Sequence, residues 1–80
     1  MDDQQIIDRI NDLAREEHQL FTRESEGSVT PQERERLRRI EVTLDQAWDL
    51  LHQRRALRNA GSDPDEAEMR DEKTVEGYLG

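Results

Sequence analysis

Two histidines and their acidic neighbours are the residues of this sequence that could hold a metal ion. Asp49 precedes His52 by three residues, a spacing that places both side chains on one face of a helix. Carboxylate-bridged metal centres in helical bundles need such a pair from each of two helices, together with further glutamates. The other histidine, His18, has no matching partner, so we predict no metal ligand and no cofactor. A metal or small-ligand sensor that uses the two histidines stays as the second alternative.

Nucleophilic catalysis has little support in the residue types present. The chain has no cysteine, no glycine-rich phosphate loop and no Ser-His-Asp set that its expected elements would bring together. Ser25 and Ser28 lie where we expect a turn. We therefore predict that the protein is not an enzyme.

Arginine is the remaining chemically notable residue type. Nucleic-acid binding depends mainly on neutralising phosphates with basic side chains. Glutamates are interleaved with the arginines of residues 33–41, and the formal net charge of the chain is −8. A nucleic-acid-associated regulator acting through Arg54, Arg55 and Arg58 is therefore an alternative and not our main hypothesis.

Residues 26–30 form the turn between the two elements that must position these groups. Gly27 suits the left-handed residue that ends a helix. Thr30 is a favoured N-cap, Pro31 fits the first helical position, and Glu33 completes a capping box. These signals predict helices at about 3–25 and 31–60, folded back on each other. The fold class is all-α, an antiparallel, coiled-coil-like two-helix hairpin over residues 1–61.

Apolar residues recur at helical spacing in both helices. Folding about the turn places Leu20 near Leu37, Leu13 near Leu44, and Ile6 near Leu50 and Leu51. Each helix also has apolar residues beside this main stripe, which one hairpin cannot cover fully: Ile7, Ala14 and Phe21 in the first, and Thr43, Ala47, Leu50 and Leu57 in the second.

Two residues of the main stripes are ambiguous. Glu17 interrupts the first stripe, and we expect it at the hairpin edge, reaching solvent or an arginine such as Arg38, with a register-setting contact to a partner as the alternative. Trp48 is expected in the core, with insertion into a partner's pocket as the alternative.

Charge is distributed unevenly along the chain. Residues 1–30 and 61–80 each have a net charge of −5, whereas residues 31–60 have a net charge of +2, which favours antiparallel pairing of the helices. The acidic tail at 62–80 repeats the cap signals at Asp63 and Pro64, so a short helix is predicted at 64–70. The second helix is expected to extend beyond the first by about two turns, leaving a basic end.

Several segments together resemble a known family. The sequence LDQAWDLLHQRR at residues 44–55, the segment at 61–67, the triplet at 16–18 and residues 74–78 are similar to a family of short actinobacterial proteins catalogued as a domain of unknown function. The resemblance covers nearly the whole chain. It implies a bacterial cytosolic protein, and it implies no activity or site residues.

The small apolar content points to association as the function. Hydrophobic residues make up 31% of the 80 residues and charged residues 40%, and chains of this size commonly need oligomerisation. We expect a cytoplasmic protein without a membrane span that binds protein, either itself in a homodimeric four-helix bundle or a larger complex. The predicted interface residues are Ile7, Ala14, Phe21, Thr43, Ala47, Trp48, Leu50 and Leu57. The predicted charge or register contacts are Glu17, Arg54, Arg55 and Arg58.

Overall fold

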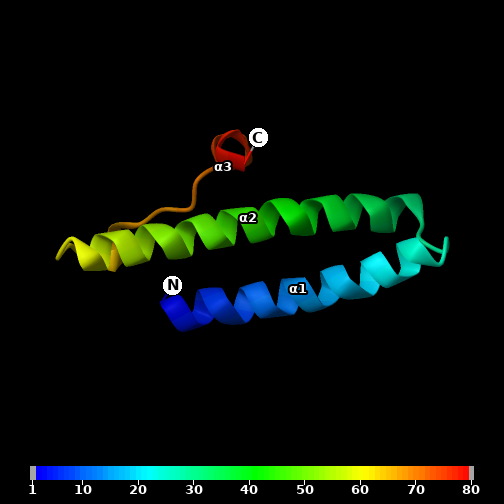
Figure 1. Ribbon diagram of the computed structural model, residues 1–80, viewed down its shortest axis with the longest axis horizontal. Coiled ribbons are helices and arrows are strands. Elements are labelled where there is room, and N and C mark those ends of the chain that lie inside the picture. Colours follow the sequence, from blue (N-terminus) through cyan, green and yellow to red (C-terminus); the bar gives the residue numbers. More distant parts are fainter. Residues whose placement is uncertain (1, 80) are drawn as a thin grey trace.

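The protein is a helical hairpin with a short helix laid across it (Figure 1). The computed structural model describes the backbone of residues 2–79 and the side chains of residues 2–75. Its elements are α1 (Asp3–Ser25), α2 (Pro31–Asn59), the 3-10 helix η1 (Pro64–Glu66) and α3 (Glu72–Leu79). The helices α1 and α2 run in opposite directions, which confirms the predicted all-α hairpin. No helix within the described part of the chain is long and apolar enough to cross a membrane.

The turn between α1 and α2 has the predicted chemistry. Gly27 has a φ of 72°, a left-handed conformation that residues with a Cβ rarely adopt. The backbone N–H of Glu33 donates to Oγ1 of Thr30 at 3.1 Å, and Glu33 Oε1 accepts from the backbone N–H of Thr30 at 3.1 Å. Pro31 is the first residue of α2. Each local signal therefore acts at its expected position.

The hairpin core consists of two adjoining clusters joined by Leu44. Near the turn, Leu13, Leu20, Leu37 and Ile40 are buried together. Towards the other end, the buried cluster contains Ile6, Ile10, Ala47, Leu50 and Leu51. The predicted helix register is therefore confirmed.

The tail differs from its prediction. The expected helix at 64–70 is only the single turn η1, where Asp63 Oδ1 accepts from the backbone N–H of Asp65 at 2.9 Å. Side chains of α2 then bind the extended backbone: Gln53 Nε2 donates to the carbonyl of Glu68 at 2.8 Å, and Gln46 Nε2 to that of Arg70 at 3.3 Å. These bonds to α2 satisfy carbonyls that a continuing helix would have bonded internally.

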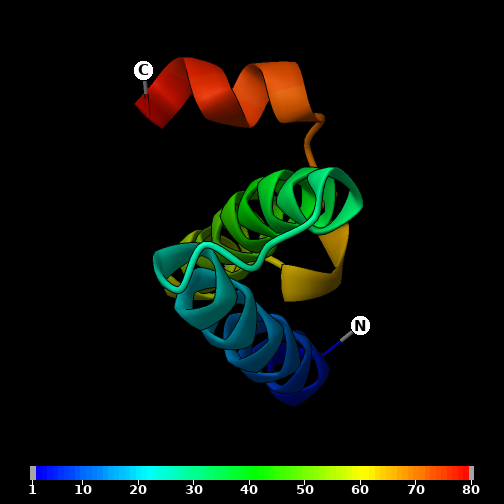
Figure 2. The same cartoon turned by 90° about the vertical axis from the view of Figure 1, so that its right-hand side faces the viewer.

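The short helix α3 lies across α2 on the side away from α1 (Figure 2). Its Val75 is buried, with 3% of its surface exposed, and Glu72 forms an ion pair with Arg38 of α2 at 3.4 Å. The tail therefore covers part of the α2 surface that the hairpin alone would leave open.

Candidate association surface

One flank of the hairpin is closed by ion pairs between α1 and α2. Glu16 accepts two hydrogen bonds from Arg36, from Nε at 2.6 Å and from Nη2 at 2.9 Å. An ion pair also joins Arg23 to Glu33. Because Glu16 and Arg23 are seven residues apart, they lie on the same edge of α1. We call this side the closed flank.

Arg54 connects three segments of the chain. It is 6% exposed, and its Nε donates to Oδ1 of Asp3 at 2.6 Å while its Nη1 donates to Oδ1 of Asp65 at 2.9 Å. Arg58 Nη2 donates to the other oxygen of Asp3 at 2.9 Å. The hydrogen bond from Arg54 is the main cause that lowers the pKa of the Asp3 carboxyl, and Arg58 adds to it.

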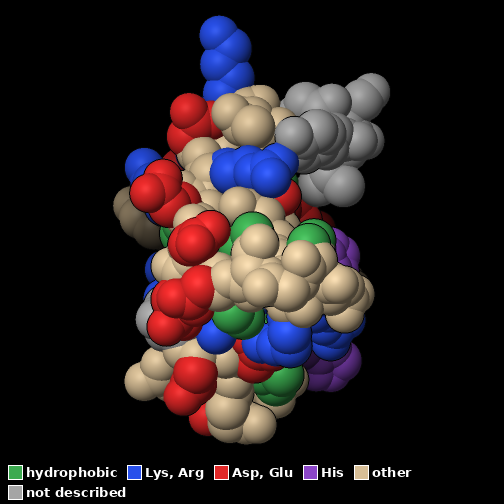
Figure 3. All heavy atoms as spheres, turned by 90° about the vertical axis from the view of Figure 1, so that its left-hand side faces the viewer, with side chains coloured by type: hydrophobic (Ala, Val, Ile, Leu, Met, Phe, Trp, Pro, Cys, Tyr) green, Lys and Arg blue, Asp and Glu red, His purple; other side chains and the backbone are tan. Residues whose placement is uncertain are grey.

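These contacts correct the prediction that Arg54 and Arg58 form charge contacts with a partner. Both arginines instead bind Asp3 at the start of α1, and α1 therefore reaches most of the end of α2 that was expected to project freely. From that end of the hairpin, acidic and basic side chains lie among one another (Figure 3). The basic end of α2 is consequently neutralised within the chain in large part.

The predicted apolar strip on α2 is also largely covered within the chain. Ala47 and Leu50 are 3% and 7% exposed and belong to the core cluster with Ile6 and Ile10, against which Ala67 of the tail packs. Thr43 and Leu57 are half-buried. The prediction of a strip that one hairpin cannot cover fully did not include the cover that the tail supplies.

The opposite side of the hairpin, the open flank, carries exposed apolar side chains. Ile7, Ala14 and Phe21 follow core residues of α1 at seven-residue intervals, so they lie on the edge of α1 away from Glu16. Phe21 is 42% exposed, Ala14 is exposed and Ile7 is half-buried against the core. The corresponding edge of α2 contains Glu41, Trp48 and Arg55.

Trp48 lies on the open flank and not in the core where it was expected. It is 44% exposed, and its ring lies 6.1 Å from that of His52, centroid to centroid. It follows Ala47, whose small side chain occupies the core position. The sequence did not indicate this outcome, because the spacing of Trp48 from the other apolar residues of α2 is compatible both with a core position and with the edge of the helix.

Glu17 is half-buried at the seam on the open flank. Burial, together with the negative charges of Glu41 and Asp45, raises the pKa of its carboxyl. No ion pair or side-chain hydrogen bond involves these three carboxylates among residues 2–75. Glu17 was expected at the hairpin edge, reaching solvent or an arginine such as Arg38; the Arg38 contact is absent there, because Arg38 binds Glu35 and Glu72.

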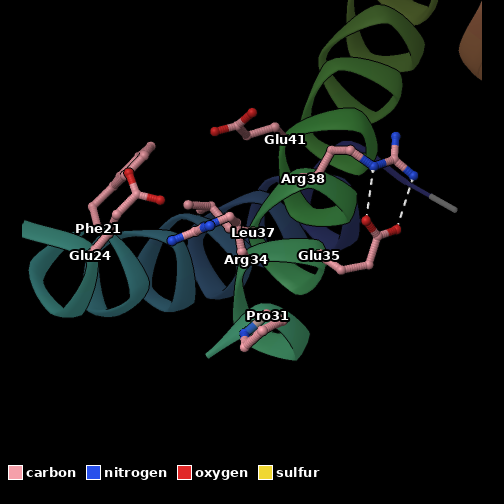
Figure 4. A pocket seen from close by; sticks show the side chains of 8 residues that line it. All are labelled: Phe21, Glu24, Pro31, Arg34, Glu35, Leu37, Arg38 and Glu41. Atoms are coloured by element: carbon pink, nitrogen blue, oxygen red, sulfur yellow. Dashed lines mark hydrogen bonds and ion pairs between the residues drawn. The ribbon is translucent and has the colours of Figure 1, made fainter. Parts of the chain in front are cut away.

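A cavity of about 530 Å³ opens at the turn end of the hairpin (Figure 4). Phe21 of α1 and Leu37 of α2 form its apolar part, and Arg34 and Glu41 also line it. In Figure 4, the ion pair between Arg38 and Glu35 lies at the side away from Phe21. Because Phe21 and Glu41 line one cavity, the two edges of the open flank meet here.

The described residues contain no group of three or more His, Cys, Asp or Glu side chains that could hold a metal ion. Among the seven arginines of α2, only Arg34 and Arg55 have no ion pair with the residues that the structure describes. Arg55 was predicted as a register contact, and it is exposed on the open flank. Glu41 was not predicted, although its spacing of seven residues from Trp48 would have indicated it.

We expect Glu17→Leu to raise the free energy of unfolding at pH 7 by about 1 kcal/mol, because Leu would extend the apolar seam between Leu13 and Leu20. Urea unfolding at fixed protein concentration measures the change. A carboxyl with a raised pKa binds more protons in the folded state, so it lowers stability as the pH rises above its ordinary value of 4.5.

Glu17→Gln keeps the shape of the side chain and should remove this part of the pH dependence. A loss of stability in Glu17→Leu at pH 7 would contradict the position assigned to Glu17 at the seam.

Comparisons with known proteins identify relatives whose functions are not described. The family model described as "Protein of unknown function (DUF2630)" matches residues 2–80. Uncharacterized proteins of Mycobacterium tuberculosis strain H37Rv and of Mycobacterium bovis are each 48% identical to this chain over 79 residues, covering 98% of it and 91% of the relative. No solved structure shows significant similarity.

Proposed function

We propose that this chain, which belongs to the DUF2630 family of proteins of unknown function, is a non-catalytic protein–protein association module. Its binding surface would be the open flank of the hairpin. The partner is either a second copy or a larger complex. A cytoplasmic location is part of the proposal, and cell fractionation tests it.

The exposure of Trp48 is the observation that carries this proposal. Large aromatic side chains contribute much of the binding energy in protein interfaces, and Trp48 has 44% of its surface exposed. The closed flank, in contrast, has its apolar residues covered by the tail and its charges paired across the seam. The two flanks therefore differ in what they leave available for a partner.

Photo-crosslinking tests the proposed surface directly. A photoreactive phenylalanine analogue is placed at Trp48 and, as a matched control, at Met69, which is 51% exposed on the tail. We expect covalent adducts from position 48 and few from position 69, both in cells and in the purified protein if the partner is a second copy. Absence of adducts at position 48, or equal yields at the two positions, would contradict the open flank as the association surface.

A further inference from the structure

Five residues of α2 form a straight stripe along the open flank. They lie at alternating steps of four and three residues, which places them above one another on the helix surface. In chain order they are Glu41, Asp45, Trp48, His52 and Arg55. Two acidic side chains therefore precede Trp48, and a histidine and an arginine follow it. At 1.5 Å per residue, the stripe extends about 10 Å to either side of Trp48.

We propose that this stripe binds the same stripe of a second copy of the chain, antiparallel, with Trp48 on the two-fold axis. The inference rests on the proposed association function and names its partner. A two-fold axis pairs residues that lie equally far from the centre in opposite directions. Glu41 then meets the partner's Arg55, seven residues from Trp48 in each case. Asp45, three residues before Trp48, lies near the partner's His52, which is four residues after it.

The charges on the stripe determine this orientation. In a parallel pair, Glu41 would meet the partner's Glu41, and each arginine would meet its own counterpart, which is repulsive. The antiparallel pair forms the Glu41 contact with the partner's Arg55 twice by symmetry. Within the side chains of residues 2–75, neither Glu41 nor Arg55 has an ion pair, although Arg36 and Arg54 on the same helix do.

The carboxylates around Glu41 also favour an incoming cation. The negative charges of Glu41 and Asp45 both repel that of Glu17. The partner's Arg55 would arrive beside this group and offset its mutual repulsion. The partner's Arg55 would thus offset the repulsion among three neighbouring carboxylates that have no ion pair within the described side chains.

Trp48 supplies the apolar centre of the contact. Its exposed ring lies beside that of His52, and aromatic rings from two copies can pack in an offset or edge-to-face arrangement. The contact therefore combines an aromatic centre with charge pairs at both ends.

A charge-swap experiment on the full chain tests the pairing. Sedimentation equilibrium gives the dimer dissociation constant for the wild type, for Glu41→Arg, for Arg55→Glu and for the double variant. We expect each single change to weaken the dimer by about tenfold, because it replaces attraction by repulsion at two symmetric sites. The double variant should regain most of the loss. Arg15→Glu, at an exposed position, is the control and should leave the constant unchanged.

Tryptophan fluorescence provides an independent readout, since Trp48 is the only tryptophan of the chain. Dilution of the wild type should shift its emission to longer wavelength as the ring becomes hydrated, and circular dichroism verifies that each variant stays helical. No rescue in the double variant would overturn the pairing. A wild type that stays monomeric while position 48 still cross-links to another protein would overturn the second copy and leave the association function standing. A wild type that stays monomeric and gives no cross-links from position 48 would overturn both proposals.

Discussion

Leu51→Ala is expected to lower the free energy of unfolding by about 3 kcal/mol. Leu51 is 1% exposed and lies in the core cluster with Ile6 and Ile10. Truncation removes its apolar contacts and leaves a cavity that two straight helices cannot readily close. For a domain of this size the loss corresponds to a fall in melting temperature of about 15 °C.

Urea unfolding followed by circular dichroism measures this change, at one protein concentration for all variants, since association also contributes to stability. Leu57→Ala removes the same atoms from a half-buried position of α2, and we expect it to cost less than half as much. Equal losses at positions 51 and 57 would be inconsistent with a core centred on the α1–α2 seam.

Arg54→Glu is expected to have the second largest effect and to lower the melting temperature by about 10 °C or more. The change removes the hydrogen bonds that Arg54 donates to Asp3 and Asp65. It also places a third carboxylate beside these two in a buried position. The start of α1 and the tail should both detach more readily from α2.

The pH dependence of this effect follows from the lowered pKa of Asp3. A carboxyl with a lowered pKa stabilises the fold above its ordinary value of 3.8, and this stabilisation is lost as the pH falls through its folded-state pKa. The wild type should therefore lose part of its stability below about pH 4. This loss should be smaller in Arg54→Glu, where only Arg58 still lowers the pKa of Asp3.

Arg15→Glu is the matched control for Arg54→Glu. Arg15 also has an acidic partner, Asp12, but their side chains are 73% and 66% exposed. Exposed ion pairs contribute little, so its melting temperature should change by about 2 °C or less. A similar fall in both variants would mean that net charge, and not the buried contact of Arg54, determines the result.

The helices and the turn were predictable because their signals are local. Gly27, Thr30 and Glu33 act within a few residues of their own positions, through the left-handed turn and the capping box. The register between α1 and α2 followed from the turn, since a short connection leaves few ways to align the two apolar stripes. The same reasoning predicts Ile6 near Leu51, and both lie in one core cluster.

The path of the tail was less predictable because it depends on contacts with α2. Asp63 and Pro64 signal a helix start, but the backbone leaves the helix after Glu66 and is bound by Gln53 and Gln46. Nothing within residues 62–80 indicates that glutamines of α2 will donate hydrogen bonds to the carbonyls of this backbone. The cover over Leu50 was missed for the same reason.

By itself, the amino-acid sequence determined two helices of unequal length, their turn and their register, because capping and apolar periodicity act through neighbouring residues. Only the tertiary structure decided which side of the hairpin stays open. That choice depends on where long side chains reach: Arg54 turns inward to Asp3 and Asp65, while Trp48 stays exposed next to Ala47. Side-chain reach across a seam depends on both helices at once, and the pattern of either helix alone does not contain it.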